Sequence, residues 1–165
     1  MKRLALILLI VVGVNPSFAQ DNDSTYKYWM SLGVWADRDV VVNLNYSFSP
    51  GRTYFTIGYF ERGGFLGGLA SDGFLFRTVN ASIGDRMQSN WFHVSGFIGP
   101  SFNFGQRLVL GGSQESFKTV GIDIESQFLF RPANEIGFGL AVYGNLNLVR
   151  NYSGFKFLLT IGNGK

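Results

Sequence analysis

The side chains with the clearest chemical potential are His93 and Ser95, which are separated by one residue. In an extended strand alternate residues share a face, so both side chains would lie together. A serine becomes a nucleophile when a nearby base takes its proton and a third group orients that base. Glu125 is the candidate for the third group. A second pair, Asp123 and Glu125, shares a face in the same way and suggests two neighbouring carboxylates.

Other common site chemistries are not indicated. The chain contains one His and no Cys, so no metal constellation is visible, and we expect no metal ion and no cofactor. Neither Gly63-Gly64 nor Gly67-Gly68 is followed by Lys-Ser/Thr or a helix, which a phosphate-binding loop requires. The 14 basic and 11 acidic residues form no basic cluster, so the sequence does not indicate nucleic-acid binding.

The elements that would position these residues are strands. In the stretch 120–131, VGIDIESQFLFR, apolar and polar side chains alternate, which is the period of a two-faced strand. Similar stretches recur, and the sequence predicts eight strands. Their approximate ranges are 26–36, 40–48, 53–62, 74–84, 91–104, 120–131, 135–146 and 155–162.

The N-terminus has the pattern of a secretory signal peptide. Lys2 and Arg3 precede an apolar run at 4–14 and a small-residue cleavage site ending at Ala19. We therefore predict a signal peptide over 1–19 and a single β-barrel domain over 20–165. The apolar run is shorter than the roughly 20 residues that a transmembrane helix needs.

The predicted connections alternate in length. Those at 49–52, 85–90 and 131–134 are short, whereas three of the others, 63–73, 105–117 and 147–154, are longer. The segment 105–117 is either a loop or a hairpin that extends beyond the membrane, with Gly111-Gly112 as its turn. Short turns at one end and long loops at the other are typical of outer-membrane barrels.

Outward aromatic residues near strand ends suit an interfacial girdle. On the short-turn side these are Tyr28, Tyr46, Phe48, Phe55, Phe92, Phe128 and Phe130, and on the other side Tyr59, Phe102, Phe155 and, as a further candidate, Phe74.

The chain resembles the OmpA/OmpX-type family of small eight-stranded outer-membrane barrels. The segments that carry the resemblance are GFIGPSFNFG (96–105), GFGLAVYGNLN (137–147) and YSGFKFLLTIG (152–162). The resemblance covers the whole predicted mature chain and implies an all-β, antiparallel, up-and-down transmembrane β-barrel in the outer membrane of a Gram-negative cell. It also implies contact with the barrel-insertion machinery during biogenesis.

In such a barrel the inward face holds His93, Asp123, Glu125 and Lys156. Enclosed charges should pair, because isolated ones are costly. We interpret them as a structural network filling a narrow lumen, with a gated proton or ion path as the alternative.

Basic residues near the outer rim are candidates for binding lipopolysaccharide phosphates, or they are simply solvated at the rim. They are Arg62, Arg77, Arg107, Lys118 and Arg150.

Short motifs of the chain also occur in two other classes of protein. Gly33-Val34-Trp35 matches the G-x-W signature of lipocalins, which are soluble ligand carriers, but the connection that follows is short and the predicted interior is rich in Asn and Gly. The pair His93 and Ser95, with a Glu, is similar to the active site of outer-membrane lipid A deacylases. However, the predicted position of His93 is near the periplasmic end and faces inward.

The favoured function is therefore non-enzymatic. We expect an integral outer-membrane protein with a role in envelope structure or surface contact. The segments 63–73 and 105–117 would present the surface, including the apolar residues Phe65, Leu66, Leu108, Val109 and Leu110.

Overall fold

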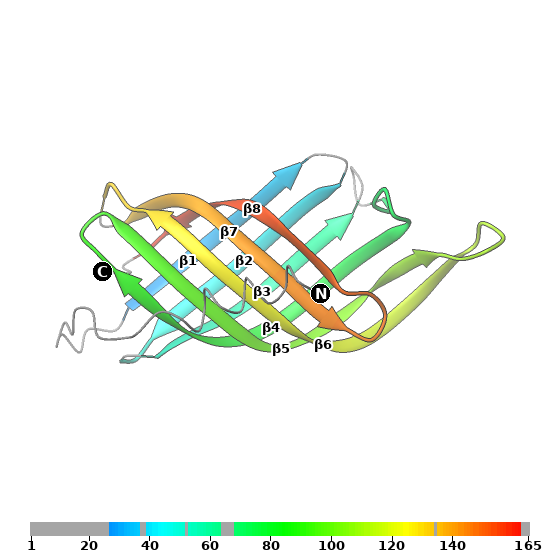
Figure 1. Ribbon diagram of the computed structural model, residues 1–165, viewed down its shortest axis with the longest axis horizontal. Coiled ribbons are helices and arrows are strands. Elements are labelled where there is room, and N and C mark those ends of the chain that lie inside the picture. Colours follow the sequence, from blue (N-terminus) through cyan, green and yellow to red (C-terminus); the bar gives the residue numbers. More distant parts are fainter. Residues whose placement is uncertain (1–26, 37–38, 52, 64–67, 134, 163–165) are drawn as a thin grey trace, which may run out of the picture.

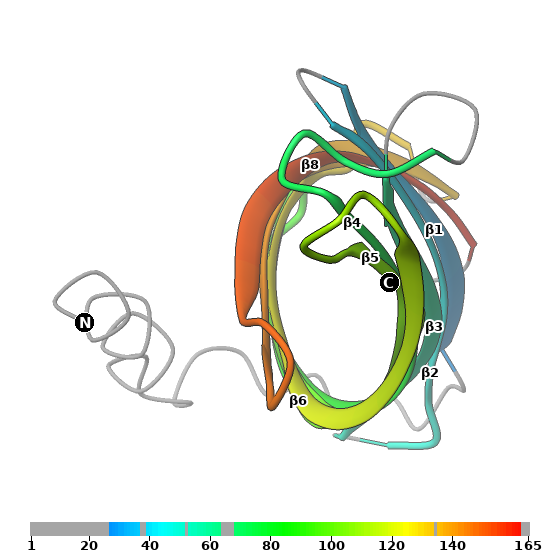
Figure 2. The ribbon, with the colours of Figure 1, turned by 90° about the vertical axis from the view of Figure 1, so that its right-hand side faces the viewer.

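The chain forms a closed barrel. The computed structural model describes residues 27–36, 39–51, 53–63, 68–133 and 135–162, so the predicted signal peptide lies outside the described residues. Each strand pairs antiparallel with its sequence neighbours, and the first also pairs with the last (Figures 1 and 2). The predicted fold class, an all-β, eight-stranded antiparallel up-and-down barrel, is confirmed. Within the described residues the strands are β1 (Lys27–Ala36), β2 (Val40–Ser49), β3 (Tyr54–Gly63), β4 (Phe74–Gln88), β5 (Phe92–Leu108), β6 (Gln114–Phe130), β7 (Ile136–Asn147) and β8 (Tyr152–Ile161).

Polarity is inverted relative to a soluble protein. On β2, Asn43 and Asn45 are buried inside the barrel, whereas Leu44 and Tyr46 are exposed on its outer surface. The other strands show the same alternation, with apolar residues outward and many polar residues inward. This arrangement follows from the period of two in the sequence, and it is the one predicted for these strands.

The hairpin of β5 and β6 is longer than its neighbours. Both strands have 17 residues and stay paired as far as Leu108 and Gln114. In Figure 1 this yellow-green hairpin projects beyond the other connections. Of the two alternatives for 105–117, the hairpin is correct and the loop is limited to 109–113. Gly111 and Gly112 form its tip with positive φ angles of 102° and 80°.

Two predicted connections are shorter in the structure. β4 continues to Gln88, so the predicted turn at 85–90 is wrong, and the connection spans 89–91. The strand is extended because Arg86 points inward and its guanidinium carbon lies 3.6 Å from the centre of the Trp29 ring. The predicted loop at 147–154 also shrinks to 148–151, because Tyr152 is already paired with Asn145 in the β7–β8 ladder.

The connections separate into two ends of the barrel. The short-turn end carries the β2–β3, β4–β5 and β6–β7 connections. The long-loop end carries the β1–β2, β3–β4, β5–β6 and β7–β8 connections. Among the described residues, no helix has the length and apolar character that would let it cross a membrane.

Candidate functional site: the lumen and the outer rim

The centre of the lumen contains a buried ion pair. The Lys156 Nζ on β8 lies 2.7 Å from Glu125 Oε2 on β6, and the two side chains are 1% and 6% exposed. Lys156 also donates to Asn43 Oδ1 at 2.8 Å, and Gln127 Nε2 donates to the other oxygen of Glu125 at 2.8 Å. Each charged group thus has both a counter-ion and a hydrogen bond, as a buried pair needs.

Asp123 is held by side-chain amides and makes no direct contact with this ion pair among the hydrogen bonds and ion pairs of the described residues. Its carboxylate accepts hydrogen bonds from Asn80 Nδ2 at 2.6 Å and from Asn145 Nδ2 at 3.4 Å. Asn145 also donates to Ser101 Oγ at 2.8 Å. The predicted pair Asp123 and Glu125 therefore shares a lumen, but each carboxylate has its own partners.

His93 and Ser95 lie further toward the short-turn end. Both are buried inside the barrel, where His93 pairs in register with Leu129, while Glu125 pairs with Phe97. Ser95 Oγ donates to Gln127 Oε1 at 3.4 Å. The structure therefore brings Glu125 to Lys156, places His93 opposite Leu129, four residues along β6 from Glu125, and turns the serine hydroxyl to an amide.

An aromatic layer lies above the polar lumen, toward the long-loop end. Phe60 stacks on Tyr152, with ring centres 5.5 Å apart, and Phe76 lies 4.9 Å from Tyr152 and 5.1 Å from Phe117. The hydroxyl groups of Tyr152 and Thr78 also form a hydrogen bond of 2.7 Å. We refer to the buried cluster of Val41, Phe60, Phe76, Phe117, Tyr143 and Tyr152 as the aromatic layer.

Sequence reasoning missed this layer. Phe60, Phe76 and Phe117 fall on the inward parity of their strands, and that parity was the available signal. Phe74, a candidate for the outer girdle, also has inward parity and packs against Phe76 and Phe117, so that assignment is wrong. The other aromatic residues assigned outward do face outward. A smaller buried cluster of Trp29, Tyr54 and Phe97 lies near the short-turn end beside Arg86.

Ion pairs connect the residues of the rim. Arg62 binds Asp39 and Asp72, and Arg150 reaches Asp72 from the β7–β8 connection at 3.2 Å. This chain of charges links the β1–β2, β3–β4 and β7–β8 connections across the mouth. Burial alone would raise the pKa of Asp39, but hydrogen bonds from Ser71 and the charge of Arg62 outweigh it and hold that pKa below its ordinary value.

Of the remaining rim cations, Arg77 and Lys118 lie on the outer wall, whereas Arg107 has the inward parity of β5 and lies on the extended hairpin. Arg77 pairs with Glu61 at 3.0 Å and Arg107 with Glu115 at 2.6 Å. Lys118 is exposed and, among the described residues, takes part in no ion pair. Four of the five predicted rim cations thus have acidic partners within the chain, and Lys118 differs from them.

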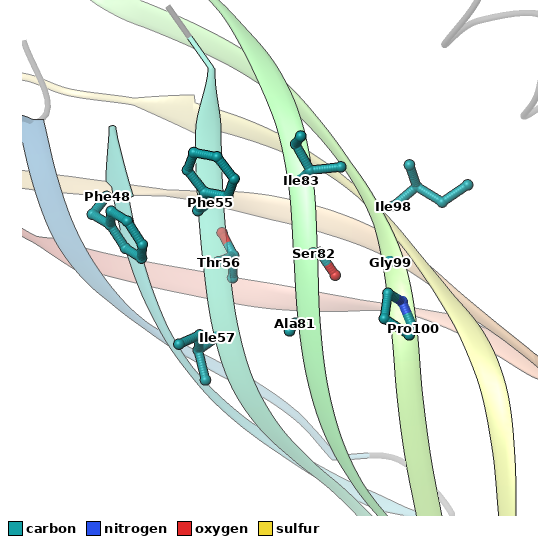
Figure 3. A pocket seen from close by; sticks show the side chains of 10 residues that line it. All are labelled: Phe48, Phe55, Thr56, Ile57, Ala81, Ser82, Ile83, Ile98, Gly99 and Pro100. Carbon is teal, nitrogen blue, oxygen red and sulfur yellow. The ribbon is translucent and has the colours of Figure 1, made fainter. Parts of the chain in front are cut away.

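The outer surface has an apolar recess over β3, β4 and β5 (Figure 3). Ala81 forms its floor, between Ile57 on β3 and Pro100 on β5. The β4–β5 ladder is interrupted here, because Pro100 has no N–H to donate. At Gly99 a Cβ would lie 2.1 Å from the Ala81 carbonyl oxygen, so only glycine fits. No ionisable side chain lines this recess, and its lining is mostly apolar.

No group of three or more His, Cys, Asp or Glu side chains that could hold a metal ion occurs in the part of the chain that the structure describes. The lumen is filled by paired polar groups and by aromatic rings. Its geometry defines a β-barrel with a packed interior and an apolar outer wall.

Comparison with known structures places this fold among small eight-stranded outer-membrane barrels. No protein-family model matches the sequence, and no curated protein matches it either. Among solved structures, the N-terminal β-barrel domain of Pseudomonas aeruginosa OprF is similar with a TM-score of 0.61 and 8% identity, over 83% of this chain and 95% of that one.

Two further structures show the same likeness. Neisserial surface protein A has a TM-score of 0.60 and 13% identity, over 84% of this chain and 96% of that one. The attachment invasion locus protein Ail of Yersinia pestis, in complex with the heparin analogue sucrose octasulfate, has a TM-score of 0.52 and 16% identity, over 83% and 94%. The resemblance to small outer-membrane barrels is thus confirmed at the level of the fold.

Proposed function

We propose that this protein is an integral outer-membrane protein of a Gram-negative cell, exported by a cleaved signal peptide at 1–19. In this proposal it acts without catalysis, in envelope structure or in surface contact. The observation that carries the proposal is the apolar outer wall of a closed sheet. Closure satisfies the backbone hydrogen bonds that hydrocarbon cannot satisfy, and an apolar wall is costly in water.

The upper limit of the apolar wall supports a membrane position. In register, Glu61 pairs with Arg77, Arg77 with Phe104, and Phe104 with Lys118. Outward residues below this level are mostly apolar, including Tyr59, Val79 and Val120. A change from apolar to charged outward residues, here on β3, β4 and β6, is expected where a barrel leaves the hydrocarbon region.

The projecting β5–β6 hairpin supports surface contact. Its tip exposes Leu108 and Leu110, which would contact a partner on the outer side. The β6–β7 ladder ends at Gly121 and Asn147, so β6 is paired only with β5 over 114–120. An unpaired strand edge offers backbone donors and acceptors to another chain. The predicted apolar residues Phe65 and Leu66 lie outside the described residues.

Lipid and lipopolysaccharide are further proposed partners, with the insertion machinery as a partner during biogenesis. The Ail structure contains a sulfated sugar, which shows that a barrel of this fold can bind a highly anionic glycan. In this chain, rim cations such as Lys118 are the counterpart, because a cation attracts phosphate or sulfate groups.

The geometry favours this proposal over the two alternatives. A lipocalin-like carrier needs a ligand cavity, whereas the lumen here is filled by the Lys156–Glu125 pair and the aromatic layer. A deacylase needs His93 and Ser95 on the lipid side near the outer leaflet, whereas both are buried in the lumen nearer the short-turn end. The filled lumen therefore does not support a ligand carrier, and the buried positions of His93 and Ser95 do not support a deacylase.

Location and topology can be tested together. We expect the protein in the outer-membrane fraction, with a gel mobility that changes on boiling. Because the chain has no cysteine, Leu110→Cys at the hairpin tip should react with a membrane-impermeant maleimide on intact cells. Trp91→Cys at the short-turn end is the matched control, exposed to 64%, and should react only after the outer membrane is permeabilised. Recovery in the soluble fraction, or equal labelling of both variants on intact cells, would contradict the proposal.

A further inference from the structure

A groove lies on the outer wall where β6 and β7 separate. It is lined by Val120 and Ile122 from β6, by Leu146 at the end of β7, and by Leu148 in the connection that follows, together with Asn147 and Asn151. It differs from the recess of Figure 3 in its position, because it lies at the level where the outer wall changes from apolar to charged residues. Lys118 is the next outward residue above Val120 on β6.

The turn beside the groove is built to hold a leucine outward. Asn147 Oδ1 accepts hydrogen bonds from the backbone N–H groups of Val149 and Arg150, at 3.0 and 2.9 Å. Its Nδ2 donates to the Arg150 carbonyl at 2.8 Å, and its own backbone N–H donates to Asn151 Oδ1 at 2.8 Å. Leu148 is thereby held 91% exposed in an ordered turn. An exposed leucine at the membrane boundary provides a fixed apolar contact.

The charge above the groove is available. The neighbouring rim acids are engaged elsewhere, Glu61 by Arg77 and Glu115 by Arg107. Lys118 is exposed on the lipid-facing side and takes part in no ion pair among the described residues. Above Gly121 the edge of β6 that faces β7 is unpaired, so the backbone N–H groups that point to that edge are also open to an acceptor. The site therefore combines a cation and amide donors above an apolar cleft.

We propose that this groove binds one phosphate-bearing lipid of the outer leaflet. An acyl chain would lie between Val120 and Ile122 on one side and Leu146 and Leu148 on the other. The lipid phosphate would bind Lys118, which lies at the height of the headgroups while the cleft lies at the height of the upper acyl chains. The inference rests on the proposed membrane location and assigns a specific lipid site within it. Charge complementarity and depth together favour an anionic lipid over a second copy of the chain.

The test uses lipid quenching in vesicles. Leu148→Cys carries a bimane label, and the protein is reconstituted in phosphatidylcholine vesicles that contain phosphatidylglycerol. The acyl chains of one lipid or the other are brominated. We expect brominated phosphatidylglycerol to be preferred at this label by about fivefold, the order of effect of one basic residue at an anionic membrane surface. Lys118→Gln should bring the preference close to one, and high salt should lower it.

The control label is Ile57→Cys, in the apolar recess of Figure 3, whose lining among the described residues contains no cation. Both lipids should quench it equally. Equal quenching at Leu148→Cys, with normal quenching at Ile57→Cys, would overturn the lipid site and leave the membrane barrel intact. Weak quenching at both labels by both lipids would instead contradict membrane insertion. Weak quenching at Leu148→Cys alone that increases on dilution with excess lipid would show a second copy in the groove and would also overturn the proposal.

Discussion

At the scale of single residues, the ion pair between Lys156 and Glu125 is the most sensitive interaction in the lumen. Both side chains are almost fully buried, so Lys156→Met would leave the Glu125 carboxylate without its counter-ion. We expect a loss of about 3–5 kcal/mol in the free energy of unfolding, because an uncompensated buried charge is costly. Urea unfolding of the protein in detergent micelles, followed by gel mobility, measures this loss.

Two control variants separate the ion pair from general effects of substitution. The double variant Lys156→Met with Glu125→Gln removes both charges and should recover part of the lost stability. Arg107→Gln breaks an exposed ion pair with Glu115 and should cost less than about 1 kcal/mol. Equal costs for Lys156→Met and Arg107→Gln would show that the lumen is hydrated enough to screen the charge.

The mouth network should respond to acid through Asp39. Its pKa is lowered in the folded protein, so its contribution to stability is present above the unfolded value of 3.8 and is lost as the pH falls through the lower folded value. We expect the wild type to lose more stability than Asp39→Asn between about pH 5 and about pH 3. Urea midpoints at the two pH values measure the difference. Parallel curves for the two proteins would contradict this role for Asp39.

At the scale of elements, two of the three glycines of β7, Gly139 and Gly144, have different constraints. At Gly139 a Cβ would lie 1.8 Å from the Phe128 carbonyl oxygen and 2.9 Å from the Leu129 Cα, and neither backbone atom can move easily. At Gly144 the nearest atoms would be 3.8 Å away. We expect Gly139→Ala to cost about 1–3 kcal/mol or more through overpacking, and Gly144→Ala to stay within about 0.5 kcal/mol. Urea unfolding of both variants compares them, and similar midpoints would exclude a close-packing role for Gly139.

The strands themselves could be predicted because each carries the two-residue period. Predicted and observed ends agree closely where a turn residue stops the alternation, as at Pro50 after β2. Predicted and observed ends disagree where a polar residue lies on the inward face and the strand continues past it. Arg86 looks like a turn residue in the sequence, but it stacks on Trp29 from another strand. Local patterns cannot reveal that contact, because the partner is distant in the chain.

At the scale of the whole molecule, parity places residues inside the barrel but does not choose their partners. The inward positions of His93, Asp123, Glu125 and Lys156 follow from alternation alone. The pairing of Glu125 with Lys156, and the position of His93 opposite Leu129, depend on the register of strands that meet only when the barrel closes. The aromatic layer depends on the same closure, because its members come from several strands.

Closure also determines whether the barrel conducts. The lumen contains two layers in series, the aromatic layer and the polar network around Lys156 and Glu125, and eight strands enclose little space beyond side chains. We expect no steady ion conductance when the protein is inserted in a planar lipid bilayer. Phe60→Ala combined with Phe76→Ala removes much of the aromatic layer and should still not conduct, since the ion pair and its amide partners fill the next level. Stable current steps in the wild type would show that the polar network opens, and would favour the gated ion path over a structural lumen.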